Sequence, residues 1–522
     1  MMNNIVIKES DLSPQVQTRQ PEPAPDDSLA VTRALFERLH AAQLRYCHWK
    51  SNEHVGAGMQ GLTDLDVLVE RGRGDDLQRI LADSGFRRFQ ATALTAYPAV
   101  EDYLGFDEVT GRIVHLHLHH RLTLGQKHLK GYRLPWEEAV LASCTLDPEH
   151  GLYVAAPEME LLLLVVRDAL KRRLRSRVAM WFGRVPAKGD FAREFAWLVE
   201  RTTPEAVVGL AVRLIGAEAE APLRRILESG ARLQDMMSFA AVVRPALRLH
   251  RTYGRLTAAL LMPIREAFWA LGGLSRKRFH WAVPLRRISP RGGVVVAFLG
   301  SDGAGKSTQC AGTVAWLSEK LDVVPVYFGS GDGPSSLVRM PLKIARRLFE
   351  RNTPGANASG KSSKNRTGWR GRIRGVAMVF WALSLSLEKR GKLRQMVRAR
   401  NRGLIVICDR FAQNQFEGFN DGRLLGKLAH SRWRLARALA AWEARPYEDA
   451  QLEAPDLVIK LVASTNVALF RRPEMTAEEI NRRIDAVRSI RFPDQTQDAE
   501  VNADQPLEAV TRSVRRLIWG VL

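Results

Sequence analysis

The sequence predicts an α/β protein in which a C-terminal parallel sheet follows an α+β region and a helical region. Three mainly apolar runs, 294–299, 404–408 and 457–462, have the length of strands and are separated by helical patterns. This is typical of a parallel sheet covered on both faces by helices. Residues 157–275 have few turn signals and apolar residues at helical spacing, whereas residues 113–119 alternate as a half-buried strand does.

The length of 522 residues corresponds to about three domains at roughly 150 residues each. The first residues are polar and proline-rich, so they cannot bury enough apolar surface to become ordered. A helical pattern begins at Ala30, and a Pro-, Arg- and Gly-rich stretch at 284–293 has the composition of a linker. We therefore expect a disordered tail, an α+β domain, a helical middle domain and a parallel-sheet domain over residues 1–28, 29–150, 151–288 and 289–522.

The composition is that of a globular protein with an excess of positive charge. Hydrophobic residues make up 46% and charged residues 26%, which excludes wholesale disorder and a collagen-like fibre. The 78 Lys and Arg residues exceed the 56 Asp and Glu residues by 22, and the isoelectric point is near 10.3. Such a charge predicts an anionic partner, which by charge alone is a nucleotide, a nucleic acid, a phosphoglycan or a membrane surface.

The expected location is the cytoplasm. The four cysteines are far apart and form no CxxC pair, which indicates neither a disulfide framework nor a structural zinc site. The N-terminus has no signal-peptide pattern, and no apolar stretch reaches the roughly 20 residues that a membrane span needs. Peripheral contact with a membrane stays open.

Residues 300–307 read Gly-Ser-Asp-Gly-Ala-Gly-Lys-Ser and fit the phosphate-loop pattern GxxxxGK[ST]. A buried run precedes the pattern and a helical segment follows it, which is the context that the pattern requires. Lys306 is expected to bind the β- and γ-phosphates, and the Ser307 hydroxyl to ligate Mg²⁺. The pattern predicts ATP and Mg²⁺ as cofactors, bound by Gly300, Ser301, Asp302, Gly303, Ala304, Gly305, Lys306, Ser307 and Thr308.

Asp409 and Arg410 directly follow the second apolar run. Ligands of parallel sheets bind beyond the carboxyl ends of the strands, so both side chains are candidates for the same site. Asp409 can hold Mg²⁺ directly or through water, and Arg410 can bind a phosphoryl group with its fork of donors. Lys306, Asp409 and Arg410 are therefore the predicted catalytic residues, with an Asp-Arg turn of purely structural role as the alternative.

Four segments resemble thymidylate kinases and occur in the order of that family. They are the phosphate loop, a strand ending in Asp-Arg-Phe, the strand before the lid, and the loop that packs on adenine, at 298–309, 402–411, 454–461 and 501–510. The resemblance implies a P-loop domain of the nucleoside-monophosphate-kinase type over about residues 290–522. It also implies a lid between Leu469 and Arg491 that stabilises the transferred phosphoryl group through arginines. The arginines available there are Arg471, Arg472, Arg482 and Arg483.

The chain departs from thymidylate kinases on the acceptor side. Leu299 stands where the family has an acid, and residues 326–334 replace the family's Arg-Glu-Pro-Gly segment. Arg390 is an approximate match to the family's acceptor-binding arginine. The resemblance therefore implies ATP-dependent phosphoryl transfer and leaves the acceptor open.

A second resemblance lies in the α+β region. Lys50-Ser51 followed by Asp64-Leu-Asp66 resembles the pattern of nucleotidyltransferases of the polymerase-β type. Carboxylates at i and i+2 of a strand face one side, so Asp64 and Asp66 are candidate ligands of a metal pair. The third carboxylate of that pattern comes from a later strand, and the candidate strand offers His117 instead. Two interpretations stay open: an active nucleotidyltransferase with an unusual metal set, or a domain that keeps the fold for binding or assembly.

His115, His117 and His119 are predicted to share one strand face, and His120 follows. Aligned imidazoles can bind zinc, although a spacing of about 7 Å along one strand suits two ligands better than a full site. The more ordinary expectation is a partly exposed strand face with unliganded histidines.

Residues 339–402 contain 18 Lys or Arg residues and two acids, and so carry +16 of the net charge. One interpretation is a surface for an anionic acceptor, either a nucleoside monophosphate or a phosphorylated or lipid-linked glycan. Contact with nucleic acid, which would be independent of base sequence, is a second, and a solvated charged face a third. Because residues 339–402 directly precede Asp409, we favour the interpretation as an acceptor surface. Specific nucleic-acid binding is not expected. Oligomerisation stays open.

The leading hypothesis is an ATP- and Mg²⁺-dependent phosphotransferase. The alternatives are nucleotidyl transfer at Asp64 and Asp66, or a nucleotide-binding scaffold in polysaccharide or membrane processes.

Overall fold

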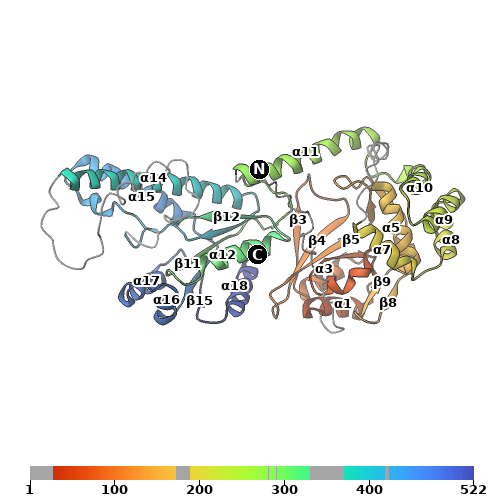
Figure 1. Cartoon of the computed structure of the whole chain (residues 1–522), viewed down its shortest axis with the longest axis horizontal. Coiled ribbons are helices and arrows are strands. Elements are labelled where there is room, and N and C mark those ends of the chain that lie inside the picture. Colours follow the sequence, from red (N-terminus) through yellow and green to blue (C-terminus); the bar gives the residue numbers. More distant parts are fainter. Residues whose placement is uncertain (1–27, 172–188, 280, 290, 330–368, 418–421) are drawn as a thin grey trace, which may run out of the picture.

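The computed structural model describes residues 28–171, 189–279, 281–289, 291–329, 369–417 and 422–522. Nearly all of the predicted tail and the basic residues between 339 and 368 lie outside these ranges. Two sheets lie side by side along the long axis of the molecule, one built from the first part of the chain and one from the last (Figure 1). The chain is thus a mixed α/β protein, as its sequence predicts.

The first sheet has eight strands in the order β10-β3-β4-β5-β2-β1-β9-β8. The predicted strand at 113–119 is confirmed, and Asp64 and Asp66 lie on a strand, as expected, that begins at Asp64. The strands are β1 Tyr46–His48, β2 Asp64–Val69, β3 Phe86–Ala91, β4 Val100–Phe106, β5 Ile113–His119, β8 Thr145–Asp147, β9 Leu152–Val154 and β10 Arg287–Ile288. A separate hairpin pairs β6 Leu122–Leu124 with β7 Tyr132–Leu134. The helices of this part are α1 Ala30–Ala41, α2 Val55–Met59, α3 Gly74–Asp83 and α4 Glu137–Ala142.

The register of three neighbouring strands places polar side chains together. β2 runs parallel to β5, with Asp64 opposite His115 and Asp66 opposite His117. β4 runs antiparallel to β5 on its other side, with Asp102 opposite His117. Acids on two outer strands therefore flank the histidines of the strand between them.

The predicted helical region is confirmed in the residues that the structure describes. Its helices are α5 Pro157–Lys171, α7 Gly189–Val199, α8 Pro204–Leu214, α9 Glu220–Ser229, α10 Leu233–Ala246 and α11 Arg255–Phe279. The buried apolar residues of α5 form one cluster with α7–α10 and with Trp49 and Leu68 of the first sheet. The 25-residue α11 leaves this cluster and runs past β3 and β4 toward the second sheet (Figure 1).

The second sheet has five parallel strands in the order β12-β13-β11-β14-β15. Its strands are β11 Val295–Gly300, β12 Val323–Tyr327, β13 Ile405–Asp409, β14 Leu457–Val462 and β15 Gln497–Asn502. Helices cover both faces: α12 Lys306–Ser318, α14 Trp369–Arg400, α15 Arg434–Leu452, α16 Thr465–Arg471, α17 Ala477–Ser489 and α18 Leu507–Val521. The three apolar runs are therefore strands of one parallel sheet that is covered on both faces. The charged residue among them, Lys460, is 3% exposed and pairs with Asp498 at 2.6 Å.

The two sheets share an apolar core where they meet. Phe106 of β4 stacks on Trp519 of α18 with ring centroids 5.5 Å apart and contacts Trp316 of α12 edge-on at 6.1 Å. The stretch that reads as a linker contributes β10, which pairs with β3, and the Asp322 carboxylate accepts hydrogen bonds from its backbone N–H groups at Leu285 and Arg286. Such packing holds the two parts against each other.

Across the described segments, none of the helices combines the length and apolar character needed to cross a lipid bilayer.

Candidate functional site

The predicted phosphate loop, residues 300–307, connects β11 to α12. Gly303 and Gly305 both have φ of +85°, a left-handed conformation that side chains disfavour and glycine adopts freely. The helix begins at Lys306, whose ammonium donates to the Gly300 carbonyl at 2.9 Å and to the Ser301 carbonyl at 2.7 Å. Lys306 is only 6% exposed. The loop therefore holds a cation at the N-terminal end of a helix, where phosphate oxygens bind well.

Ser307 and Asp409 meet at the carboxyl ends of β11 and β13. The Ser307 hydroxyl donates to Asp409 Oδ2 at 2.9 Å, and Asp409 Oδ1 is buried without a hydrogen-bond partner among the described atoms. A hydroxyl and a carboxylate with an unused oxygen are the hard oxygen ligands that Mg²⁺ prefers. These two residues therefore fit the magnesium site that the sequence predicts.

Asp302 lies between two arginines beside the loop. Its carboxylate pairs with Arg410 at 3.2 Å and with Arg483 of α17. Burial works against the ionised form of Asp302, but the charges of Lys306, Arg410 and Arg483 outweigh it and lower the pKa of this carboxyl. Arg410 has φ of +68°, a strained conformation for a residue with a side chain, directly after Asp409. Sequence reasoning placed Asp302 in the loop but missed its role as the partner of these arginines.

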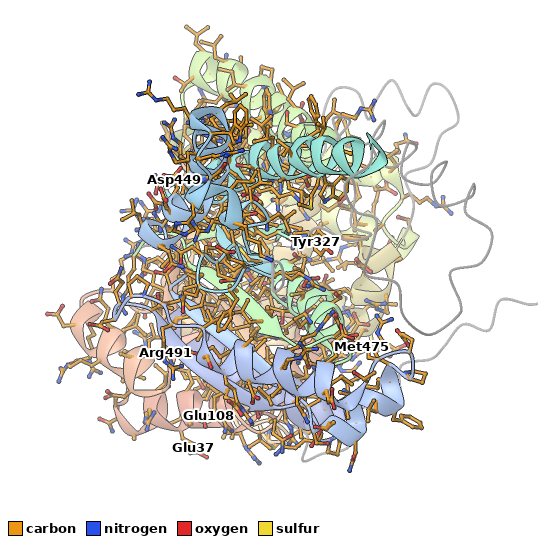
Figure 2. All side chains as sticks on the ribbon, turned by 90° about the vertical axis from the view of Figure 1, so that its left-hand side faces the viewer. Glu37, Glu108, Tyr327, Asp449, Met475 and Arg491 are labelled. Carbon is orange, nitrogen blue, oxygen red and sulfur yellow. The ribbon has the colours of Figure 1, made fainter. Side chains whose placement is uncertain are left out.

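The four candidate lid arginines occupy different positions. Arg471 donates to the Gly303 carbonyl at 3.0 Å, and both Arg471 and Arg472 line the cavity at the loop. Arg483 reaches Asp302, while Arg482 is exposed. Figure 2 looks onto this part of the molecule, where the labelled Met475 and Arg491 flank α17.

A cavity of about 520 Å³ adjoins the loop. One wall is formed by loop residues 302–308 and Arg410. The opposite wall comes from the segment after β15 and the start of α18, through Ala503, Gln505, Leu507 and Val510. The phosphate loop and the segment predicted to pack on adenine thus face one cavity.

The acceptor side differs from its expected form. The predicted residue, Arg390, is half-buried on α14. Its neighbour Lys389 is 3% exposed and donates to the Phe328 carbonyl at 3.2 Å, just beyond the end of β12. Lys389 is therefore a basic residue of α14 that reaches the carboxyl edge of the sheet.

In the first sheet, each of three carboxylates has a basic partner. Asp64 binds Lys320 at 2.6 Å and Asp66 binds Lys50 at 2.8 Å. The third carboxylate, Asp102 of β4, was missed by sequence reasoning and binds Arg287 at 2.7 Å. Lys320 comes from the part of the chain that builds the second sheet, and Arg287 comes from β10, which precedes that part. The ammonium groups of the two lysines and the Arg287 guanidinium contact the carboxylate oxygens that a metal pair would use. In this arrangement the three carboxylates do not fit a two-metal centre.

The three histidines do share one strand face, but the expectation that this face is partly exposed is wrong for two of them. His115 is 0% and His119 5% exposed. His115 lies 2.9 Å from both Asp64 and Asp102, and His119 lies 3.0 Å from Asp66. Burial lowers the pKa of both histidines. Asp102 and Arg287 close this face, and neither was assigned to it from sequence.

His117 lies between Asp66 at 3.3 Å and Asp102 at 3.2 Å. Burial opposes its protonation, but the hydrogen bonds to the two carboxylates raise the pKa of His117 to about 9. Among the described residues, Asp64, His115 and His117 could hold a single metal ion, because their ligand atoms lie within 4.8 Å of one another. Lys320 would have to leave Asp64 for such an ion to bind.

No family model matches the chain. Two proteins of Escherichia coli K12 are similar to part of it. The uncharacterized ATP-binding protein YghR is 26% identical over 234 residues, which cover 43% of this chain and 86% of the relative. The uncharacterized ATP-binding protein YghS is 25% identical over 231 residues, which cover 44% of this chain and 93% of the relative.

Proposed function

We propose that this chain is an ATP- and Mg²⁺-dependent phosphotransferase of the nucleoside-monophosphate-kinase type, similar to thymidylate kinases, with residues 289–522 as its catalytic domain. The observation that carries the proposal is that Lys306, Ser307 and Arg410 line one cavity, with Asp409 hydrogen-bonded to Ser307 beside it. The ATP-binding names of the two relatives support ATP as the nucleotide. ATP as donor implies a cytoplasmic location.

The loop would bind the phosphates of ATP. Lys306 is positioned to contact the β- and γ-phosphates while its neighbours present backbone N–H groups at the start of α12. Ser307 and Asp409 would hold Mg²⁺, which neutralises charge on the phosphates during transfer. Transfer of this kind proceeds in line and depends on positioning and charge stabilisation, so no covalent enzyme intermediate is needed.

Arg410 and Arg483 would stabilise the transferred phosphoryl group. Both guanidinium groups are held by Asp302 at the edge of the loop. Guanidinium donors that are already oriented stabilise developing charge without a reorganisation cost during the reaction. Asp302 would act as the residue that positions them.

The acceptor would be an anion bound near the end of β12. The buried Lys389 beside Phe328 lies on this side, on the basic helix α14. We propose a nucleoside monophosphate or a phosphorylated or lipid-linked glycan as acceptor. The experiment is a transfer assay with γ-labelled ATP on purified full-length protein, using dTMP, other nucleoside monophosphates and sugar phosphates.

Lys306→Ala should abolish label transfer, while the exposed Lys427→Ala should leave it unchanged. Equal transfer by wild type and Lys306→Ala would refute the proposal, because Lys306 is the residue proposed to bind the β- and γ-phosphates.

We also propose peripheral contact with an anionic membrane through α11, on a separate observation. Five large apolar side chains of this helix are 52–82% exposed. At about 100° per residue they fall within an arc of roughly 80°, so they form one stripe. The stripe consists of Leu256, Leu260, Ile264, Leu271 and Leu274, and exposed basic residues stand at its ends, Arg255 before it and Lys277 and Arg278 after it. An apolar stripe with basic ends is typical of helices that lie in a membrane interface.

A further inference from the structure

A second cavity lies where the two sheets meet, away from the phosphate loop. Its volume is about 310 Å³. One side is formed by β2, β4, β5 and the β6–β7 hairpin, and the other by Trp269 of α11, the segment Leu285–Arg287 and Glu319 at the end of α12. Both halves of the chain therefore contribute walls to it. Figure 1 shows the two sheets side by side and α11 passing β3 and β4.

The cavity contains more basic groups than carboxylates. Its charged lining consists of Lys50, Lys130, Arg286 and Arg287 against Asp66, Asp102 and Glu319, with His117 in addition. Asp66 is paired with Lys50, and Asp102 with Arg287. The carboxylates of Asp66 and Asp102 thus already have basic partners, and neither of them balances the charge of Lys130.

Lys130 is half-buried and forms an ion pair with none of the described carboxylates. Its ammonium lies 5.2 Å from the ring centroid of Tyr97, a neutral side chain that also lines the cavity. Burial, followed by the charges of Lys50 and Lys171, lowers the pKa of Lys130 to about 7. A cation whose charge is disfavoured in this way gains from an anionic ligand more than an exposed lysine would.

The backbone holds Lys130 in a conformation that a lysine does not favour. Its φ is +49°, in the left-handed region, which costs on the order of 1 kcal/mol for a residue with a side chain. The turn is fixed by neighbours: the Tyr97 hydroxyl donates to the Lys127 carbonyl at 2.6 Å, and Arg265 of α11 donates to the His128 carbonyl at 3.1 Å. Strain maintained by surrounding contacts is common at ligand sites.

The remaining walls are apolar and aromatic. Trp49, Tyr97 and Trp269 line the cavity, and Trp49 Nε1 and His119 Nδ1 are buried without hydrogen-bond partners among the described atoms. Aromatic faces beside a cation suit a ligand that has a ring or another apolar part as well as an anionic group.

We propose that this cavity binds a small phosphorylated molecule with a ring, that Lys130 is the cation that anchors its phosphate, and that no divalent metal takes part. The metal-free mode follows from the pairing of Asp64, Asp66 and Asp102 with basic side chains. A nucleotide and a sugar phosphate both carry a phosphate on a part that contains a ring. The base of a nucleotide would stack on the aromatic side chains, whereas a sugar ring would donate hydrogen bonds from its hydroxyls.

The test is calorimetric titration of the full chain with inorganic pyrophosphate in the presence of EDTA. It is done in a Lys306→Ala background, which silences the phosphate loop and keeps the result independent of the proposed phosphotransfer. One binding site should remain in Lys306→Ala. Adding Lys130→Gln should lower the affinity of that site for pyrophosphate about tenfold or more, because one charge-assisted contact is lost. Adding Lys130→Arg should preserve it, and so should Lys127→Gln, which removes an exposed lysine of the same turn.

Repeating the titration with AMP and with glucose 1-phosphate shows whether the ligand is a nucleotide or a sugar phosphate. The one whose ring fits the cavity should bind more tightly than pyrophosphate. Three results would overturn the proposal: no pyrophosphate binding to Lys306→Ala, unchanged affinity after Lys130→Gln, or binding that requires Mg²⁺ and disappears in EDTA. An unchanged melting temperature of Lys130→Gln and Lys130→Arg would show that a lost site is not an unfolded protein.

Discussion

Lys320 donates to Asp64 across 2.6 Å and thereby joins the end of the phosphate-loop helix to the first sheet. The helix α12 begins at Lys306, beside the cavity at the loop, and ends at Ser318, two residues before Lys320. Burial works against the ionised form of Asp64, but its hydrogen bond to His115 and the charges of His117 and Lys320 lower the pKa of this carboxyl. One helix therefore connects the candidate ATP site with the carboxylates of the first sheet.

The Lys320–Asp64 pair should stabilise the fold measurably. Because both side chains are partly exposed, we expect Lys320→Met to lower the free energy of unfolding by about 1 kcal/mol. A double-mutant cycle with Asp64→Asn, measured by chemical denaturation, should give a coupling energy of similar size. Lys427→Met is the exposed control. Strictly additive single-mutant effects would show that the contact has no energetic consequence.

Asp409 should be needed for the response to magnesium. Asp409→Asn keeps the shape of the side chain and removes the charge that a divalent ion requires. We expect ATP binding in EDTA to be nearly unchanged and the gain in affinity on adding Mg²⁺ to be lost, as measured by calorimetry. The control is Asp449→Asn, at an exposed residue of α15. Asp449 is labelled in Figure 2, and this variant should respond to Mg²⁺ as the wild type does. A normal magnesium response in Asp409→Asn would exclude this carboxylate as a ligand.

Two adjacent arginines of α17 provide a matched pair. Arg483 reaches Asp302 beside the loop, whereas Arg482 is exposed. Arg483→Gln should lower kcat about 10²-fold with a small change in KM for ATP, because the guanidinium would act mainly in the transition state. Arg482→Gln should stay within about twofold of wild type. Equal losses in both variants would mean that α17 acts only through its overall charge.

Ligand binding at Lys130 should weaken as pH rises. The lowered pKa of about 7 means that the free amine is mostly charged below neutral pH and mostly neutral above it. Lys50, Lys171, Arg167 and Asp66 are the charged groups that act on it. Since pyrophosphate also titrates, the affinity of wild type is compared with that of Lys130→Arg, which stays charged. The dissociation constant of wild type divided by that of Lys130→Arg should rise about tenfold between about pH 6 and about pH 9. A ratio that does not change with pH would contradict the assignment.

Vesicle binding should depend on the stripe of α11. Sedimentation with vesicles containing phosphatidylserine should capture the wild type, and neutral phosphatidylcholine vesicles should capture much less. Replacing Leu260 and Ile264 by serine removes two of its exposed apolar side chains and should reduce capture several-fold. Val109→Ser, at an exposed apolar residue elsewhere, is the control. Capture that is indifferent to the stripe would end the membrane proposal.

Local patterns in the sequence predict much of the second sheet and its site. Mainly apolar runs mark β11, β13 and β14 because these strands are buried on both faces. The glycines of the loop mark its left-handed positions. Asp409 is predictable because it ends a strand whose carboxyl edge must face the ligand.

Residues that depend on distant pairing could not be predicted in the same way. Asp102 joins the acidic group only because β4 pairs antiparallel with β5, which no local pattern specifies. Arg287, 170 residues further along the chain, lies 3.2 Å from His117, and no local pattern specifies that contact. Lys389 and Arg390 are neighbours in a basic run, and only the rotation of α14 decides which of them reaches Phe328.

The central claim, ATP-dependent phosphotransfer at the phosphate loop, is tested most directly by ATP turnover in purified full-length protein with Mg²⁺ and a responsive acceptor. Lys306→Ala should lower kcat/KM by about 10²-fold or more, while Lys427→Ala keeps the wild-type rate. Turnover by Lys306→Ala at the wild-type rate would contradict the account.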